Sequence, residues 1–237
     1  MTVKGQKHLT RQCLRGLFET ARRDFKLIIV DAGEDSERFL PADWHDIEGE
    51  FEVLIHPKMA ISAAWNEGMA SILKTQPNLF TEECDIWLLN NDVIFHRPVW
   101  FDLLSLRLND SDVGMVGTSS MSLFGHPFVT GGIWGFNLAN ALEIAEDGRI
   151  LDEQLNYSCM DVDLSIRFSR AGYVVTHVPG IEWGPDPMIT HLISQTVYAN
   201  EGMREVFKKR EPERRRIIDK HGRKDGLFGY EGVVEVE

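Results

Sequence analysis

Three short polar residues interrupt an otherwise apolar stretch of the chain. Ile86-Trp87-Leu88-Leu89 carries no polar residue, Asn90-Asn91-Asp92 follows it directly, and Val93-Ile94-Phe95 is apolar again. A carboxylate flanked by amides suits a hard divalent cation that keeps some of its waters and also holds a phosphate. We therefore predict that Asp92 binds such a cation. The alternative is a polar turn that only ends a strand.

The elements around this turn favour the first interpretation. A run that is apolar on every side predicts a strand buried on both faces of a sheet, and α/β proteins bind ligands at the carboxyl ends of such strands. Further strands are predicted at 26–30, 51–55, 112–117 and 173–178, and helices at 7–23, 62–73, 99–106, 137–146 and 161–171. Strands alternating with helices imply an α/β fold with a Rossmann-like, mostly parallel sheet flanked by helices.

Composition sets broad limits on the function. The chain has 237 residues and a formal net charge of −12, which argues against general nucleic-acid binding. It has no apolar run of the ~18 residues that a membrane span needs, and no signal-peptide pattern at its start. Its three cysteines are scattered, so a reducing, cytoplasmic setting is expected.

Five segments, taken in order, resemble the motifs of family 2-like inverting glycosyltransferases, in particular the rhamnosyltransferase-like branch. They are Ile28-Ile-Val-Asp31, Ala63-Ala-Trp-Asn-Glu-Gly68, Leu88-Leu-Asn-Asn-Asp92, Met160-Asp-Val-Asp-Leu-Ser-Ile-Arg167 and the late histidine His191. The resemblance covers roughly residues 7–225 and implies the GT-A nucleotide-sugar fold. It also implies a UDP- or dTDP-sugar donor, a glycan or other hydroxyl acceptor, and Mn²⁺ or Mg²⁺.

The resemblance assigns roles to particular residues. Asp161 is the expected catalytic base, and Asp92 with His191 is expected to hold the metal. The resemblance also implies that Asp31, Asn66 and Asn90 contact the nucleotide or the donor. Apart from the resemblance, the glycine- and aromatic-rich stretch predicts that Gly131, Gly132 and Trp134 contact the donor sugar. Glycines allow a ligand to approach the backbone closely, and the tryptophan would offer its aromatic face to a sugar ring. A bulged strand with a core tryptophan is the alternative for the last three.

Two features depart from the family pattern. Only Met1–Gly5 precedes the first helix, so the usual first strand is either a stub at Thr2-Val3 or missing. Met160 replaces the usual glutamate before Asp161, so like charge should raise the pKa of Asp161 less. Both departures leave open a non-catalytic GT-A-like module that binds a glycan or a protein.

The C-terminal part of the chain differs in charge from the rest. Residues 208–224 carry nine Lys/Arg and three Asp/Glu, a local charge of +6 on a chain otherwise at −18. We predict a transferase domain over residues 1–200 and a basic helical extension over 201–237, with two short helices that meet near Pro212. The extension is expected to cover the donor diphosphate or an acidic acceptor, because Lys and Arg pair well with phosphate. A solvated basic helix is the alternative.

Overall fold

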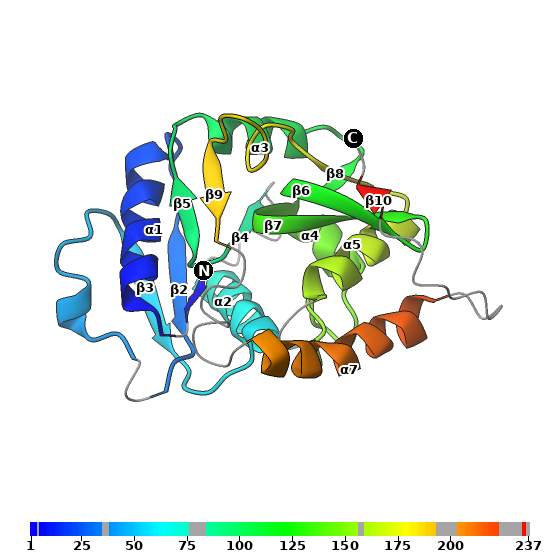
Figure 1. Cartoon of the computed structure of the whole chain (residues 1–237), viewed down its shortest axis with the longest axis horizontal. Helices are drawn as coiled ribbons and strands as arrows, with labels where there is room; N and C mark the ends of the chain where they lie inside the picture. Colours follow the sequence, from blue (N-terminus) through cyan, green and yellow to red (C-terminus); the bar gives the residue numbers. More distant parts are fainter. Residues whose placement is uncertain are drawn as a thin grey trace.

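The computed structural model describes residues 1–3, 5–34, 38–75, 84–155, 159–192, 203–222 and 234–235. Its elements are shown in Figure 1. In chain order they are β1 (Thr2–Val3), α1 (Lys7–Thr20), β2 (Leu27–Asp31), a 3-10 turn (Pro41–Asp43), β3 (Phe51–Ile55), α2 (Ile61–Thr75), β4 (Asp85–Leu89), β5 (Val93–Phe95), α3 (Trp100–Leu108), β6 (Val113–Leu123), β7 (His126–Asn137), α4 (Leu138–Glu143), α5 (Met160–Arg170), β8 (Val174–His177), β9 (Ile189–His191), α7 (Met203–His221) and β10 (Val234–Glu235).

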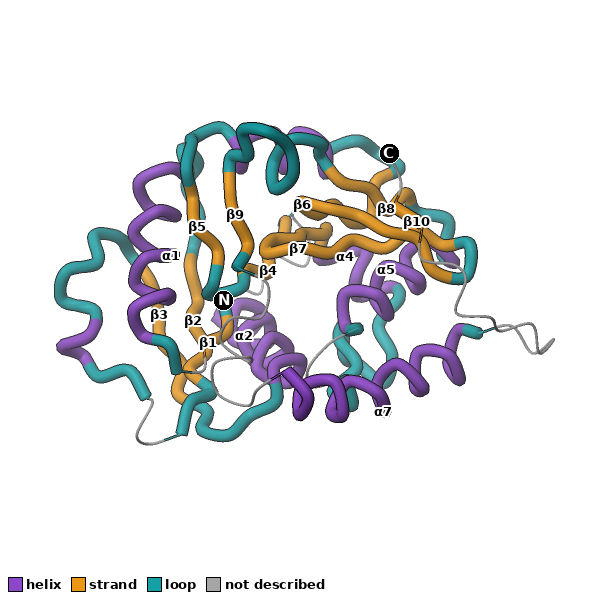
Figure 2. Tube along the Cα trace, in the orientation of Figure 1, coloured by secondary structure: helices purple, strands orange, loops and turns teal. Residues whose placement is uncertain are grey.

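The strands form a mixed central sheet. β1, β2 and β3 pair in parallel, and an isolated parallel bridge between Thr2 and Asn90 joins β1 to the end of β4. β7 then pairs antiparallel with both β4 and β6, and β8 pairs in parallel with β6. As the sequence predicts, β1, β2 and β3 are parallel on one side of β7, and β6 and β8 are parallel on the other. β7 itself is antiparallel to its neighbours, because a tight hairpin joins it to β6 (Figure 2).

Helices cover both faces of this sheet, which explains the unbroken apolar run of β4. Ile86 and Leu88 belong to a core that includes residues of α2, α4 and α5. Leu89 and the partly buried Trp87 face the opposite core, built with residues of α1 and α3. Successive strand residues point to opposite faces, so burial on both sides requires apolar residues at every position. The α/β fold class predicted from the sequence is confirmed.

Of the two possibilities for the first strand, the structure shows the two-residue stub at Thr2–Val3. Other details differ from the sequence predictions. The helix predicted at 137–146 is limited to Leu138–Glu143. The two short helices predicted around Pro212 are one helix, α7, which carries Pro212 in its interior. The boundary predicted between residues 200 and 201 lies outside the described residues. Within the described part of the chain, no helix has both the length and the apolar character to cross a bilayer.

Candidate functional site

Two short strands bring Asp92 and His191 together. β5 pairs antiparallel with β9, with Val93 opposite His191, and the Leu192 amide donates to the Asp92 carbonyl across 3.0 Å. In this register Oδ1 of Asp92 lies 3.2 Å from Nε2 of His191. Both side chains are largely buried, with 5% and 11% of their surfaces exposed. The two residues that the sequence suggested as metal ligands are therefore neighbours.

A second carboxylate lies on the other side of the same imidazole. Oε1 of Glu182 is 3.7 Å from Nδ1 of His191, and its Oε2 accepts hydrogen bonds from the Thr118 hydroxyl and, across 3.3 Å, from the Gly132 amide. The side-chain amide of Asn90 lies 3.2 Å from His191 Nε2. The imidazole is thus enclosed by two acids and one amide, and we call Asn90, Asp92, Glu182 and His191 the histidine cluster.

Gly131 and Gly132 let strand β7 run against the histidine cluster. Gly131 has a φ of +103°, and a Cβ atom there would lie 2.3 Å from Oε2 of Glu182. A Cβ atom on Gly132 would lie 2.3 Å from the side chain of Val93 and 3.2 Å from the ring of His191. A larger residue at either position would displace the cluster. The close approach expected of these glycines therefore exists toward Glu182 and His191, and an approach toward a sugar stays a prediction.

The cluster has unusual protonation equilibria. Burial alone would lower the pKa of His191, but the carboxylates of Asp92 and Glu182 outweigh it and raise that pKa to about 9. Burial would raise the pKa of Glu182, yet the hydrogen bonds from His191 and Thr118 hold it below its ordinary value. A positive charge on the imidazole therefore balances part of the negative charge of two buried acids.

Once its imidazole gives up a proton, His191 has with Asp92 the spacing of two neighbouring ligands of a divalent cation. Two ligands at right angles, each about 2.1 Å from an ion, lie about 3 Å apart, close to the observed separation. Among the described residues, no group of three or more His, Cys, Asp and Glu side chains is arranged to hold a metal. A Mg²⁺-like ion that retains waters and binds substrate phosphates needs only one or two protein ligands. Glu182 would then orient the imidazole from its far nitrogen, as acids commonly do at metal sites.

Asp161 lies in the first turn of α5 and is partly buried. Burial raises the pKa of its carboxyl to about 6, although the Val162 amide donates to Oδ1 across 2.9 Å and the charges of Arg210 and His191 lower it. With Met160 in place of the family's glutamate, burial and not like charge raises this pKa.

Asp31 and Trp134 are buried and make their contacts within the chain. Asp31 is fully buried, and its two oxygens accept hydrogen bonds from the amides of Gly33 at 2.9 Å and Phe39 at 2.8 Å. It holds the loop after β2 and presents no surface to a nucleotide base. Trp134 is 2% exposed and packs edge to face on Trp65, with ring centroids 5.3 Å apart, so it belongs to the core.

Asn66 also has a structural role that its motif did not predict. Its Nδ2 donates to the Leu151 carbonyl across 2.9 Å, and its Oδ1 accepts from the Leu151 amide across 3.0 Å. A third hydrogen bond reaches Oε1 of Glu153 at 3.1 Å. The side chain thus fixes α2 to the segment before α5, and its polar atoms are used within the chain instead of facing a donor.

Helix α7 is attached to α5 through a buried acid. Asp163 is fully buried and lies 2.9 Å from Arg167 Nε, 2.8 Å from Lys220 Nζ and 2.7 Å from His221 Nε2. Burial raises the pKa of Asp163, but these three partners outweigh it and lower the pKa to about 2. The C-terminal end of the basic helix is therefore fixed to the domain by these side chains. Figure 1 shows α7 along the lower edge of the molecule.

Comparisons with known proteins agree with this fold. No protein-family model matches the chain, and no curated protein matches it in sequence. The fold is the GT-A-like fold of glycosyltransferases. Among solved structures, the chain resembles the mannosyltransferase PcManGT from Pyrobaculum calidifontis, in complex with GDP-Man and Mn²⁺, at 12% identity and a TM-score of 0.53.

That match covers 75% of this chain and 53% of the mannosyltransferase, so the chain spans about half the length of the protein it resembles. A second structure, mouse xyloside xylosyltransferase 1 in its apo form, aligns at 12% identity over 88% of this chain and 91% of its own. Its TM-score of 0.43 is too low to support an argument.

Proposed function

We propose that the protein is a metal-dependent glycosyltransferase that moves a sugar from a nucleoside diphosphate donor to a hydroxyl acceptor with inversion. The contact between Asp92 and His191 at the end of the central sheet carries this proposal. UDP- and dTDP-sugars follow from the sequence resemblance, and GDP-sugars join them because the mannosyltransferase of the same fold was solved with GDP-Man. The acceptor is a glycan or another hydroxyl compound.

Asp161 is the proposed general base. Its carboxylate takes the proton of the acceptor hydroxyl as that oxygen bonds to the anomeric carbon. The bond from this carbon to the diphosphate oxygen breaks on the opposite side, and its electron pair leaves with the nucleoside diphosphate. A pKa of about 6 suits the role, because the group is ionised at neutral pH and still accepts a proton readily.

Asp92 and His191 are the proposed ligands of a divalent cation, with Asn90 beside them. When bound, Mn²⁺ or Mg²⁺ supplies positive charge that stabilises the leaving diphosphate. Glu182 holds the imidazole from its other nitrogen, and Gly131 and Gly132 leave room for this arrangement. Asp31, Asn66 and Trp134 are assigned no contact with the donor, since they are engaged within the chain.

The first experiment supplies a panel of UDP-, dTDP- and GDP-sugars with Mn²⁺ and measures release of the free nucleotide. Release that depends on the metal and disappears in Asp161→Asn supports the proposal, and the anomeric configuration of a transferred sugar, read by NMR, tests inversion. A non-catalytic GT-A-like module is favoured by the internal engagement of Asp31 and Trp134. That module would bind a nucleotide or glycan without releasing nucleotide from any donor.

A further inference from the structure

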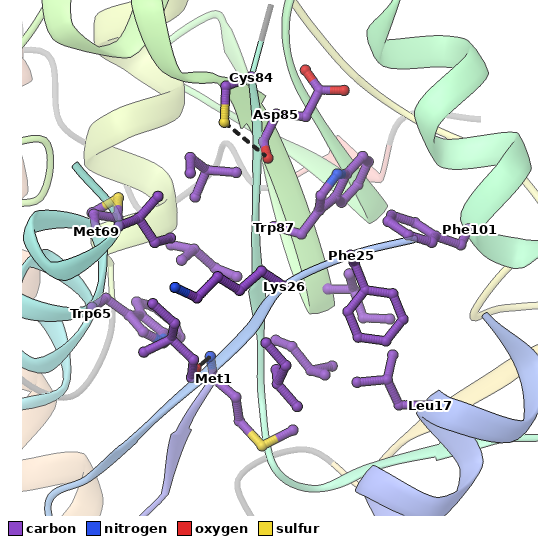
Figure 3. A pocket seen from close by; sticks show the side chains of 18 of the residues that line it. Met1, Leu17, Phe25, Lys26, Trp65, Met69, Cys84, Asp85, Trp87 and Phe101 are labelled. Atoms are coloured by element: carbon purple, nitrogen blue, oxygen red, sulfur yellow. Dashed lines mark hydrogen bonds between the residues drawn. The ribbon is translucent and has the colours of Figure 1, made fainter. Parts of the chain in front are cut away.

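The loop between β8 and β9 presents one tryptophan to solvent. Trp183 has 59% of its surface exposed, whereas the other five tryptophans of the chain are buried or half-buried. Two of these, Trp65 and Trp87, line a cavity of about 410 Å³ between β2 and β4 (Figure 3). Because a flat apolar ring of this size can pack on a ligand, Trp183 is the indole that a molecule arriving from solvent meets first.

The loop that carries Trp183 is closed at its base. Ile181 is fully buried, and its carbonyl accepts hydrogen bonds from the amides of Met188, across 2.8 Å, and Ile189, across 3.0 Å. Residues 182–187 therefore begin and end at fixed points of the domain. Figure 1 shows this loop along the upper edge of the molecule, between β8 and β9.

Two prolines and one ion pair restrict the loop further. The rings of Pro185 and Pro187 fix their φ angles. Asp186, between them, forms an ion pair with Arg97, whose amide donates to the Met188 carbonyl across 3.3 Å. The side chains of this pair are 50% and 63% exposed. The loop is thus ordered in advance, which lowers the entropy cost of binding a ligand, and it holds charged groups at its surface.

The same loop supplies Glu182 to the histidine cluster. Glu182 directly precedes Trp183, and its buried carboxylate lies beside His191 and accepts from the Gly132 amide. Consecutive Cα atoms lie ~3.8 Å apart, so the chain passes from the buried cluster to the exposed indole within one residue. Trp183 is therefore at the boundary between the candidate site and solvent.

The exposed groups of the loop match the chemistry of a sugar ring. One face of a pyranose carries mostly C–H groups, which pack on an aromatic ring, and its edge carries hydroxyls. Hydroxyls both donate and accept, so the guanidinium of Arg97 and the carboxylate of Asp186 are suitable partners. A single exposed apolar residue is common on protein surfaces. Here the exposed ion pair and the neighbouring histidine cluster are two further observations on the same loop.

We propose that Trp183 and the ion pair of Arg97 with Asp186 bind a sugar ring of the acceptor, so that the acceptor of the transferase is a glycan. This inference rests on the proposed function, because the bound ring belongs to the molecule whose hydroxyl gives its proton to Asp161. The ring packs on the indole face, and its hydroxyls bond to the two charged side chains. The acceptor is thereby narrowed from any hydroxyl compound to a carbohydrate.

Nitrogen-15 NMR of the six indole N–H groups tests the site without any catalysis. Trp183→Phe identifies the Trp183 signal, and cellobiose, lactose and mannobiose are each titrated into the native chain. Since pyranoses share the C–H face that stacks, at least one disaccharide is expected to shift this signal and leave the other five in place. If none does up to its solubility limit, the proposal is overturned. A signal that shifts only with protein concentration assigns the indole to self-association and overturns it too.

The kinetics of sugar transfer test what the site does for the reaction. Trp183→Ala is expected to raise the acceptor KM ~10-fold or more, with kcat lowered ~3-fold at most. Trp183→Phe keeps a flat aromatic face and is expected to stay within ~3-fold of the native KM. Leu40→Ala is the matched control, because Leu40 is equally exposed at 59% and lies between β2 and β3. Equal acceptor KM values in Trp183→Ala and Leu40→Ala overturn the proposal.

The two tests separate this inference from the proposed function. If the native chain transfers no sugar but a disaccharide still shifts the Trp183 signal, the transferase proposal fails and the sugar site stands. If transfer proceeds with an unchanged acceptor KM in Trp183→Ala, the transferase stands and the sugar site fails.

Discussion

His221, the last residue of α7, places its Nε2 2.7 Å from the carboxylate of Asp163 in the first turn of α5. The contact joins the basic C-terminal helix to the domain at a fully buried acid that also meets Arg167 and Lys220. Asp163→Asn leaves these cations in place without their common partner. Removing one member of a buried ion pair costs about 3–5 kcal/mol, so urea unfolding is expected to show a loss of that order.

Asp110→Asn is the matched control for Asp163, because Asp110 is exposed and forms an ion pair with Arg107 across one turn. Its free energy of unfolding is expected to change by less than about 0.5 kcal/mol. If both variants unfold alike, Asp163 does not anchor α7.

The depressed pKa of Asp163 predicts how stability varies with acid. Its folded pKa is about 2, below the ordinary value of 3.8, so the folded state favours the ionised form. The resulting stabilisation is present above pH 4 and is lost as the pH falls toward 2. Urea unfolding between pH 5 and 2 should therefore show a steeper decline for the native chain than for Asp163→Asn. Parallel curves would contradict the assignment.

Asp161→Asn tests the proposed base. The variant is nearly isosteric, so donor affinity should stay close to that of the native enzyme while kcat falls by ~10²-fold or more. The raised pKa adds a second readout. Native activity should increase as the pH rises through about 6, where the base ionises, and the residual activity of the variant should lack this limb. An equal loss of donor binding would make Asp161 a binding residue instead.

Arg210 tests whether α7 also contributes to the site. Its charge lowers the pKa of Asp161, so Arg210→Gln should move the acidic limb of the activity profile above pH 6. If the basic helix also contacts the donor diphosphate, the donor KM should rise several-fold while the Tm changes little. Arg215→Gln is the control, since Arg215 is exposed and pairs with Glu211 on its own helix. Identical kinetics in the two variants would limit α7 to packing.

The sequence predicted those parts of the fold that depend on local pattern. The apolar run of β4 is buried on both faces, and the acid that follows it lies beside the late histidine. Side-chain type and order along the chain were sufficient for these features. The stub at Thr2–Val3 was likewise one of two stated possibilities.

The sequence pattern did not predict which residues far apart in the chain come into contact. Glu182 enters the histidine cluster only because β9 returns beside β5, and the one sequence signal for it is an isolated acid between Ile181 and Trp183. Asp31 matched a motif and Trp134 lies in a glycine- and aromatic-rich stretch, yet local amides bond to the first and Trp65 packs on the second. Sequence order does not show whether a side chain faces a ligand or its own fold.

The central claim is that Asp92 and His191 hold a divalent cation, and Mn²⁺ binding followed by electron paramagnetic resonance tests it without any substrate. The native chain is expected to bind Mn²⁺, with affinity reduced at least ~10-fold in Asp92→Asn and in His191→Ala. Asp102→Asn is the control. It alters an exposed acid of α3 that pairs with Arg23, and it is expected to bind Mn²⁺ like the native chain. Unchanged Mn²⁺ affinity in Asp92→Asn, with the variant shown to be folded, would contradict the account.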